Sequence, residues 1–209
     1  MHTDYSSNYG KTSKPKYFSC LNGRKKIHRE YAYAYLKQHN LLDKGVSTFV
    51  WKGISIDGYS TPEDITSHTV QPDNFYTIFD DTYYDIITET LVGNESGLDW
   101  WQEVFITEKV WRSIYYKRPF MVIGNMNTLK VLHDLGFKTF DNILFDETYD
   151  ELEDFQMRTY RVLEQNKNII DTHSLQDLEK IIYSNEMIEI IEHNYKQINK
   201  IADIYRQSR

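Results

Sequence analysis

Residues 84–124 read YDIITETLVGNESGLDWWQEVFITEKVWRSIYYKRPFMVIG, and this stretch decides the fold class. Its first residues, Tyr84–Glu89, are rich in β-branched and aromatic side chains, as expected of a strand. Thr107 can cap a helix over about 108–117, and the continuous apolar run Phe120–Ile123 then has the composition of a strand buried on both faces. A strand, a helix and a buried strand in this order predict a right-handed βαβ unit in a parallel sheet.

The amino-terminal part of the chain repeats this order. Tyr17–Leu21 is a strand candidate, residues 22–26 form a basic turn, a helix is expected over Ile27–Gln38, and Val46–Trp51 is a second β-branched and aromatic strand candidate. We therefore expect an α/β fold with a parallel sheet flanked by helices. Ligands of such sheets bind outside the carboxyl ends of the strands, so the segments after Leu21 and Glu89 are the ones to examine for a site.

The remaining sequence suggests three parts. Residues 1–14 are polar and aperiodic and are expected to be a flexible tail, 15–150 to form the sheet domain, and 151–209 to form a helical extension packed on it. Within the domain we expect a short helix capped by Asn125 or Asn127 and ended by Gly136.

A further short strand is expected from 138–140 and 143–145. Residues 148–151 and 174–177 both resemble capping boxes, in which a hydroxyl and a carboxylate close a helix start. A final helix is expected over about Glu186–Tyr205, because aliphatic and aromatic residues recur there at helical spacing.

Composition excludes several classes of protein. The 209 residues include 31 acidic and 24 basic side chains, a formal charge of −7, so strong sequence-independent nucleic-acid binding is not expected. A single cysteine, Cys20, rules out a disulfide-built scaffold. The seven histidines show no metal-ligand spacing, and no apolar run approaches the roughly 20 residues of a membrane span. We expect no metal, no membrane span and a reducing, cytoplasmic setting.

The first candidate site is the basic turn, which contains Arg24, Lys25, Lys26, His28 and Arg29 after Asn22. Cations at a helix start oppose the helix dipole, whereas a bound phosphate reverses that penalty. The turn is therefore either an anion site or a solvated basic segment, and the residues alone favour neither.

The second candidate is Thr107-Glu108-Lys109 at the start of the predicted helix, and the third is Glu89 at a strand end. Lys109 could reach a phosphate and Glu108 could accept hydrogen bonds from a ribose. Equally, Lys109 could pair with Glu108, and Glu89 could be a helix cap or an ion-pair partner.

Taken together, these segments resemble the donor-binding half of the fucosyltransferase-type glycosyltransferases. The matching pieces are a strand ending in Glu89, the aromatic-x-Thr-Glu-Lys helix start at 105–109 and the Pro-apolar-Gly strand at 119–124. The opening, 16–22 followed by Arg29, is similar to the family's lysine-rich strand, Asn turn and helix-start arginine. Residues 137–150 are similar to short glycosyltransferase-like chains of large bacteriophages and algal viruses.

The resemblance implies a Rossmann-like domain of the GT-B type that binds a nucleotide-diphosphate sugar without a metal or other cofactor. It implies that Arg29 and Lys109 contact the diphosphate and Glu108 the ribose. Asn22 and Glu89 would line the pocket, and Arg24 and Thr107, from the same two motifs, complete the candidate donor-binding set.

The chain departs from the family at three points. Thr90 stands where the family usually has Asn, the loop before Thr107 is longer, and 209 residues are enough for little more than one of the two domains of a GT-B enzyme. No residue matches the catalytic base, which in the family lies in the acceptor-side domain. We expect a glycosyltransferase whose acceptor is unknown, a glycan being the first candidate and a modified nucleic acid the second. A second copy or a partner chain would supply the acceptor side. The alternative is a non-catalytic module that retains the fold.

Overall fold

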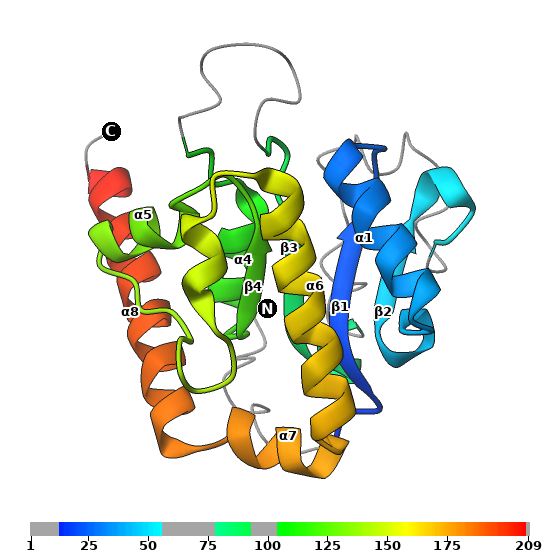
Figure 1. Cartoon of the computed structure of the whole chain (residues 1–209). Coiled ribbons are helices and arrows are strands. Elements are labelled where there is room, and N and C mark those ends of the chain that lie inside the picture. Colours follow the sequence, from blue (N-terminus) through cyan, green and yellow to red (C-terminus); the bar gives the residue numbers. More distant parts are fainter. Residues whose placement is uncertain (1–12, 56–77, 93–103, 208–209) are drawn as a thin grey trace.

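The computed structural model describes residues 13–55, 78–92 and 104–207 (Figure 1). The Thr-Pro pair at 61–62 also predicts the start of a short helix, and a long polar and aromatic loop is expected before Thr107; that helix and most of that loop lie outside these residues. Most of the expected tail does too, but Lys14 is described. Its backbone N–H donates to the Tyr83 hydroxyl (3.1 Å) and its ammonium to the carbonyl oxygen of Phe79 (2.5 Å).

Four strands form one sheet in the order β2-β1-β3-β4. They are β1 (Lys16–Asn22), β2 (Val46–Phe49), β3 (Thr82–Thr88) and β4 (Phe120–Ile123), and every neighbouring pair is parallel. The α/β fold class with a Rossmann-like parallel sheet is therefore confirmed. The chain leaves β1 towards β2 on one side and leaves β3 towards β4 on the other, so the strand order reverses between β1 and β3.

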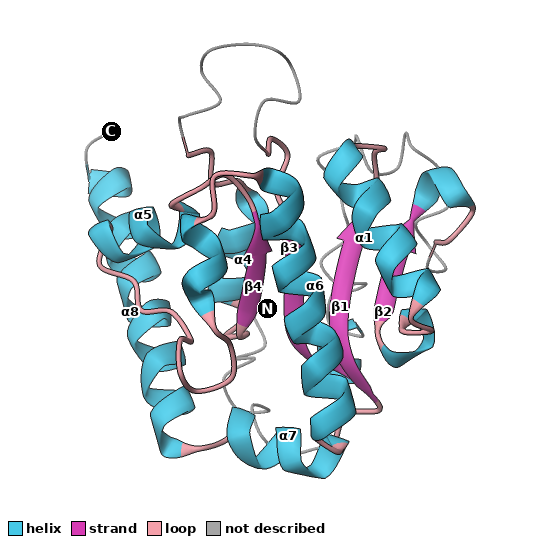
Figure 2. Cartoon of the chain, in the orientation of Figure 1, coloured by secondary structure: helices cyan, strands magenta, loops and turns pink. Residues whose placement is uncertain are grey.

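Helices cover both faces of the sheet (Figures 1 and 2). They are α1 (Ile27–Gln38), α4 (Glu108–Tyr115), α5 (Thr128–Asp134), α6 (Phe155–Thr172), α7 (Leu175–Ile182) and α8 (Asn185–Gln207). Right-handed crossovers in opposite directions put α1 and α4 on opposite faces. In Figure 1, α1 and α6 lie in front of the sheet and α4 behind it, and α4 packs along α8. None of the helices in the described ranges is long and apolar enough to cross a membrane.

The core lies between the sheet and these helices. All seven residues of β3 are buried, as expected of a strand covered on both faces. At its centre, Asp85 accepts hydrogen bonds from Ser19 on β1 (2.7 Å), from Ser113 on α4 (2.7 Å) and from the buried guanidinium of Arg118 (2.9 Å). These contacts tie α4 and the start of β4 to the sheet.

Several expected elements are confirmed at the residues predicted. The helix at 27–38, the strand at 120–123 and the Thr107 cap are as expected, and Gly136 has φ +83° at the end of α5. The second strand is shorter than expected, because the chain turns at Phe49 into a 3-10 helix, η3 (Val50–Lys52), that Gly53 closes with φ +72°.

The strand expected at 138–140 and 143–145 is wrong: the structure has only an isolated bridge between Asp141 and Phe145 there. A side chain takes the place of a neighbouring strand, since the Glu147 carboxylate accepts the backbone N–H of Phe140 (2.8 Å).

Two of the expected caps also differ. Asp146, not Thr148, caps the 3-10 helix η5 (Glu147–Glu151), and α5 receives its cap from the distant carboxylate of Asp150, which accepts the N–H of Leu129 (2.9 Å). Ser174 caps α7 as the sequence predicted.

Candidate functional site

The candidate site lies at the carboxyl ends of β1 and β3, where the strand order reverses. The two strand ends are joined side chain to side chain, because the Thr88 hydroxyl donates to the amide oxygen of Asn22 (2.5 Å). The Asn22 backbone N–H donates to Thr48 on β2 (2.8 Å) and its amide nitrogen to the Cys20 carbonyl (3.3 Å). Asn22 is buried and holds three strands together at this edge.

The first turn of α1 contacts the end of β3 directly. The Arg29 guanidinium donates to the carbonyl oxygens of Thr88 (3.3 Å) and Glu89 (3.2 Å), and also to that of Arg24 (3.0 Å). The His28 ring nitrogen Nε2 lies 2.9 Å from the same Glu89 carbonyl, and since a carbonyl only accepts, Nε2 carries the proton. Both side chains are buried and hold the basic turn against β3.

The first turn of α4 contacts the other side of the same residue. One oxygen of the Glu89 carboxylate accepts the backbone N–H of Thr107 (2.9 Å). The other accepts the Thr107 hydroxyl and the N–H of Thr90 (3.2 Å). The Glu89 side chain is fully buried, so this carboxylate fixes the amino end of α4.

Lys109 is the second residue of α4. Its ammonium donates to the hydroxyls of Thr107 (2.9 Å) and Thr90 (3.0 Å), while its carboxylate neighbours are more distant, Glu108 at 3.4 Å and Glu89 at 3.6 Å. The side chain is 16% exposed. Its nearest partners are thus neutral hydroxyls, and part of its surface remains open to an anion.

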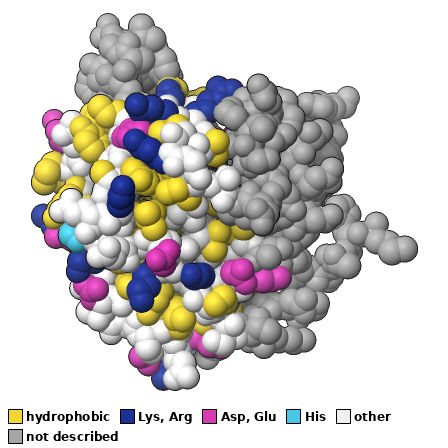
Figure 3. Space-filling model, turned by 90° about the vertical axis from the view of Figure 1, so that its right-hand side faces the viewer, with side chains coloured by type: hydrophobic (Ala, Val, Ile, Leu, Met, Phe, Trp, Pro, Cys, Tyr) yellow, Lys and Arg dark blue, Asp and Glu magenta, His cyan; other side chains and the backbone are white. Residues whose placement is uncertain are grey.

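Three charged side chains of the candidate set face solvent. Arg24 and Lys25 are exposed in the β1–α1 turn, and Glu108 is 78% exposed at the start of α4. Lys26 occupies the N-cap position of α1 and supplies no side-chain cap. In the space-filling view several Lys and Arg side chains lie toward the top, the end to which the strands point (Figure 3). This edge is a positively charged rim on an acidic protein.

The structure brings both predicted motifs to Glu89, the basic turn through its carbonyl and the α4 start through its carboxylate. It divides the candidate residues into two groups. The contacts of Asn22, Arg29, Glu89 and Thr107 described above are made within the protein, whereas Arg24, Glu108 and part of Lys109 face outward. Sequence reasoning missed Thr88 and Thr90 as the hydroxyls that link these groups, and a Thr-Glu-Thr string is too common to indicate such a role.

Other groups in the described residues offer no second centre of this kind. Burial raises the pKa of the Cys20 thiol to about 12, so it stays protonated and is not a nucleophile. No group of three or more potential metal-ligating side chains occurs in the ranges that the structure covers.

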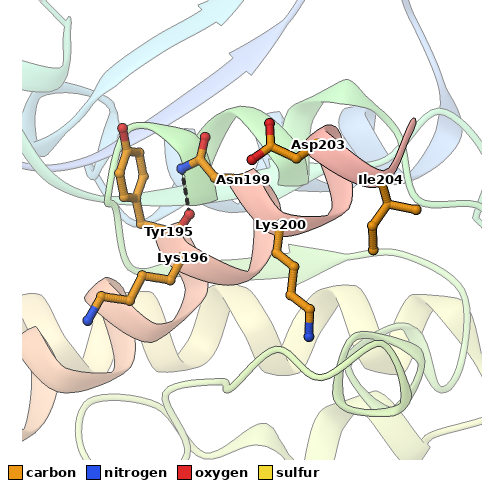
Figure 4. Close-up of a pocket in the computed structure, with 6 residues that line it drawn as sticks. All are labelled: Tyr195, Lys196, Asn199, Lys200, Asp203 and Ile204. Carbon is orange, nitrogen blue, oxygen red and sulfur yellow. Dashed lines mark hydrogen bonds between the residues drawn. The ribbon is translucent and has the colours of Figure 1, made fainter. Parts of the chain in front are cut away.

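A surface hollow of about 510 Å³ lies along the carboxyl-terminal half of α8 (Figure 4). Its described wall is Tyr195, Lys196, Asn199, Lys200, Asp203 and Ile204, all from this one helix. Figure 1 shows α8 on the β4 side of the sheet, away from β1 and β2. Since a single helix forms the described wall, the sheet edge remains the better candidate for chemistry.

Comparisons with protein-family profiles, with curated proteins and with solved structures found no match. The class of the protein therefore rests on its own fold and candidate site. It is an α/β protein with a four-stranded parallel, Rossmann-like sheet and a basic rim at the point where the strand order reverses.

Proposed function

We propose that the protein binds a nucleotide-diphosphate sugar at the carboxyl ends of β1 and β3 and acts as a glycosyltransferase or as its donor-binding domain. One observation carries the proposal: the first turns of α1 and α4 both contact Glu89, which brings two helix amino ends, the basic turn and Lys109 to one point. Open parallel sheets bind ligands at such a reversal of strand order.

A diphosphate is the ligand that suits this combination of groups. Helix amino ends carry partial positive charge and present N–H groups, and Arg and Lys side chains add full charges and donors. In the proposed complex Arg24, Lys25 and Lys109 contact the diphosphate, because their side chains reach solvent at this edge. Glu108 accepts hydrogen bonds from the ribose hydroxyls. Arg29 acts indirectly, by holding the β1–α1 turn in place.

The proposed reaction is a displacement at the anomeric carbon. An acceptor hydroxyl forms a bond to that carbon, the bond from carbon to the diphosphate oxygen breaks, and the hydroxyl proton passes to a base. Negative charge builds on the leaving diphosphate, where the positively charged rim would stabilise it without a metal ion.

Calorimetric titration with nucleoside diphosphates and their sugar conjugates tests the proposal. Arg24→Ala removes an exposed cation whose loss leaves the core contacts intact, so we expect an affinity at least tenfold lower with an unchanged melting temperature. Lys109→Ala should weaken binding by more than tenfold. Arg161→Ala, which removes an exposed arginine from α6, is the matched control and should bind as the wild type does. Equal affinity in all four proteins would overturn the proposal.

A specific observation also favours the non-catalytic alternative. At this edge the Glu89 carboxylate is fully buried and accepts three hydrogen bonds, His28 is turned toward a carbonyl, and the exposed Glu108 is assigned to the ribose. A base would then come from an acceptor-side domain on a second copy or a partner chain. Slow release of free sugar from the donor would support an enzyme, whereas binding without turnover would support a module.

The acceptor and the setting belong to the same proposal. A glycan is the first candidate acceptor and a modified nucleic acid the second, since the net charge of −7 disfavours a polyanion. A cytoplasmic setting, that of an infected host cell if the protein is viral, is proposed with them. Retention on a DNA column at moderate salt would favour the nucleic acid.

A further inference from the structure

Three side chains outside the candidate site form a continuous hydrogen-bonded chain. The ring nitrogen Nε2 of His133, in the last turn of α5, lies 2.8 Å from the Thr139 hydroxyl oxygen. The same hydroxyl is hydrogen-bonded to Oε2 of Glu147 in η5. Gly136 makes this arrangement possible, because its positive φ turns the chain back directly after α5.

The ends of this chain differ in their access to water. Thr139 is buried, the Glu147 side chain is largely shielded and the His133 ring is exposed. The other Glu147 oxygen, Oε1, accepts the backbone N–H of Phe140 (2.8 Å), which fixes the carboxyl group with Oε2 toward Thr139. A proton that reaches Glu147 along the chain therefore enters at the imidazole.

The Thr139 hydroxyl has one proton to donate and two lone pairs that accept, so it links the states of its two neighbours. When Glu147 is ionised it only accepts, so Thr139 donates to Glu147 and His133 must donate through Nε2–H. When Glu147 is protonated it donates to Thr139, and the Thr139 proton is released to a bare Nε2, the other acceptor in this hydrogen-bonded chain. Protonation of the carboxyl thus favours the ring that carries its proton on Nδ1.

The Glu147 carboxyl changes its protonation state near neutral pH. Burial raises the pKa of its carboxyl to about 7, against the opposing effect of the hydrogen bonds from Thr139 and Phe140, and the negative charges of Asp141 and Asp150 raise it further.

The surroundings of His133 carry mostly paired charges. On α5 itself Lys130 pairs with Asp134 (2.7 Å). From α8, Glu189 pairs with Lys138 (3.3 Å), and His193 lies 2.8 Å from the Gly136 carbonyl oxygen.

We infer that His133, Thr139 and Glu147 form a proton relay that exchanges protons between a buried carboxyl and the surface and reports the state of the carboxyl as the tautomer of an exposed imidazole. The relay balances. A solvent proton binds Nδ1 of His133, the Nε2 proton passes to the Thr139 oxygen, and the Thr139 proton passes to Glu147. One proton is taken up, and the ring ends neutral with its proton on Nδ1.

Nitrogen NMR of the histidine rings in the intact chain at about pH 8.5 tests this inference, since neutral rings then dominate. In the wild type we expect His133 as the Nε2–H tautomer. Glu147→Gln should convert it to the Nδ1–H tautomer, because the Phe140 N–H holds the amide oxygen and turns the amide NH₂ toward Thr139. His193 is the internal control and should stay Nε2–H in both proteins, because it faces a carbonyl oxygen. The same His133 tautomer in both proteins would overturn the relay.

If the Glu147→Gln variant does not fold, a pH titration of the wild type tests the inference instead. The side-chain carboxyl carbon of Glu147 should show a transition near pH 7. Thr139→Val should raise that midpoint, because the ionised carboxylate loses a hydrogen bond, whereas Thr172→Val, an exposed threonine on α6, should leave it unchanged. A Glu147 midpoint below pH 5, or a midpoint that Thr139→Val leaves unchanged, would contradict the inference.

Discussion

Glu89→Gln is the substitution that most sharply tests how the site is built. The carboxylate accepts the N–H and the hydroxyl of Thr107 and the N–H of Thr90, and it lies 3.6 Å from the Lys109 ammonium. A glutamine amide has one oxygen, so its NH₂ group must face at least one of these donors. The substitution removes one or two charge-assisted hydrogen bonds and the negative charge that balances Lys109.

The expected cost follows from these contacts. A hydrogen bond to a charged group contributes about 1.5–3 kcal/mol, and losing one member of a buried pair costs about 3–5 kcal/mol. Because Lys109 is partly exposed and keeps Glu108 nearby, we expect the free energy of unfolding to fall by about 3 kcal/mol. For a chain of this size that is a melting temperature lower by about 6–12 °C.

Urea denaturation followed by tryptophan fluorescence measures this difference. Glu108→Gln is the matched control, since it makes the same chemical change one residue before Lys109 at a side chain that is 78% exposed. We expect the control to change stability by less than about 0.5 kcal/mol. A Glu89→Gln variant within about 1 kcal/mol of the wild type would refute the reasoning, because the carboxylate would then not hold α4 to β3.

Three further predictions concern stability. The folded protein holds the Glu147 proton more tightly than the unfolded chain, so Glu147 should contribute about 3 kcal/mol to the free energy of unfolding at about pH 4 and almost nothing at about pH 8; urea midpoints of the wild type and of Glu147→Gln across that range measure this contribution, and a difference between them that does not change with pH would contradict it. Ser174→Ala should cost about 1 kcal/mol in urea denaturation, because its hydroxyl accepts the N–H of Asp177 (3.2 Å) at the start of α7; no measurable loss would mean that this cap is dispensable. Gly45→Ala should lower the melting temperature, since a Cβ there would lie 2.6 Å from the Phe18 ring and 2.7 Å from its carbonyl oxygen, and a melting temperature equal to that of the wild type would show that the strand end can move aside.

The sheet and its first helices could be predicted because their signals are local. The buried run 120–123 and the polar first turn of α4 each carry their structure in a few neighbouring residues, and parallel crossovers then leave few topologies. The segment 138–145 could not be predicted in the same way. Its apolar residues, Phe140 and the run 143–145, suggest a strand, but the backbone there is fixed by the Glu147 carboxylate, a contact that no local pattern predicts.

The candidate site was predictable in place but not in detail. Both segments were expected at the carboxyl edge of a parallel sheet, and the observed strand order, which places β1 beside β3, brings Asn22 and Glu89 close together. Which side chains turn inward could not be read from the sequence. Arg29 donates to the carbonyl oxygens of Thr88 and Glu89, about 60 residues away in the chain, and nothing near Arg29 distinguishes that role from a contact with phosphate.

The most direct test of the account is to map a bound nucleoside diphosphate by amide NMR on the intact chain. The account predicts that the largest shifts fall on 23–28 and 107–109, the two segments that meet at Glu89, with little change along α8. Saturable shifts confined to α8, or no saturable shift with any nucleoside diphosphate, would contradict it.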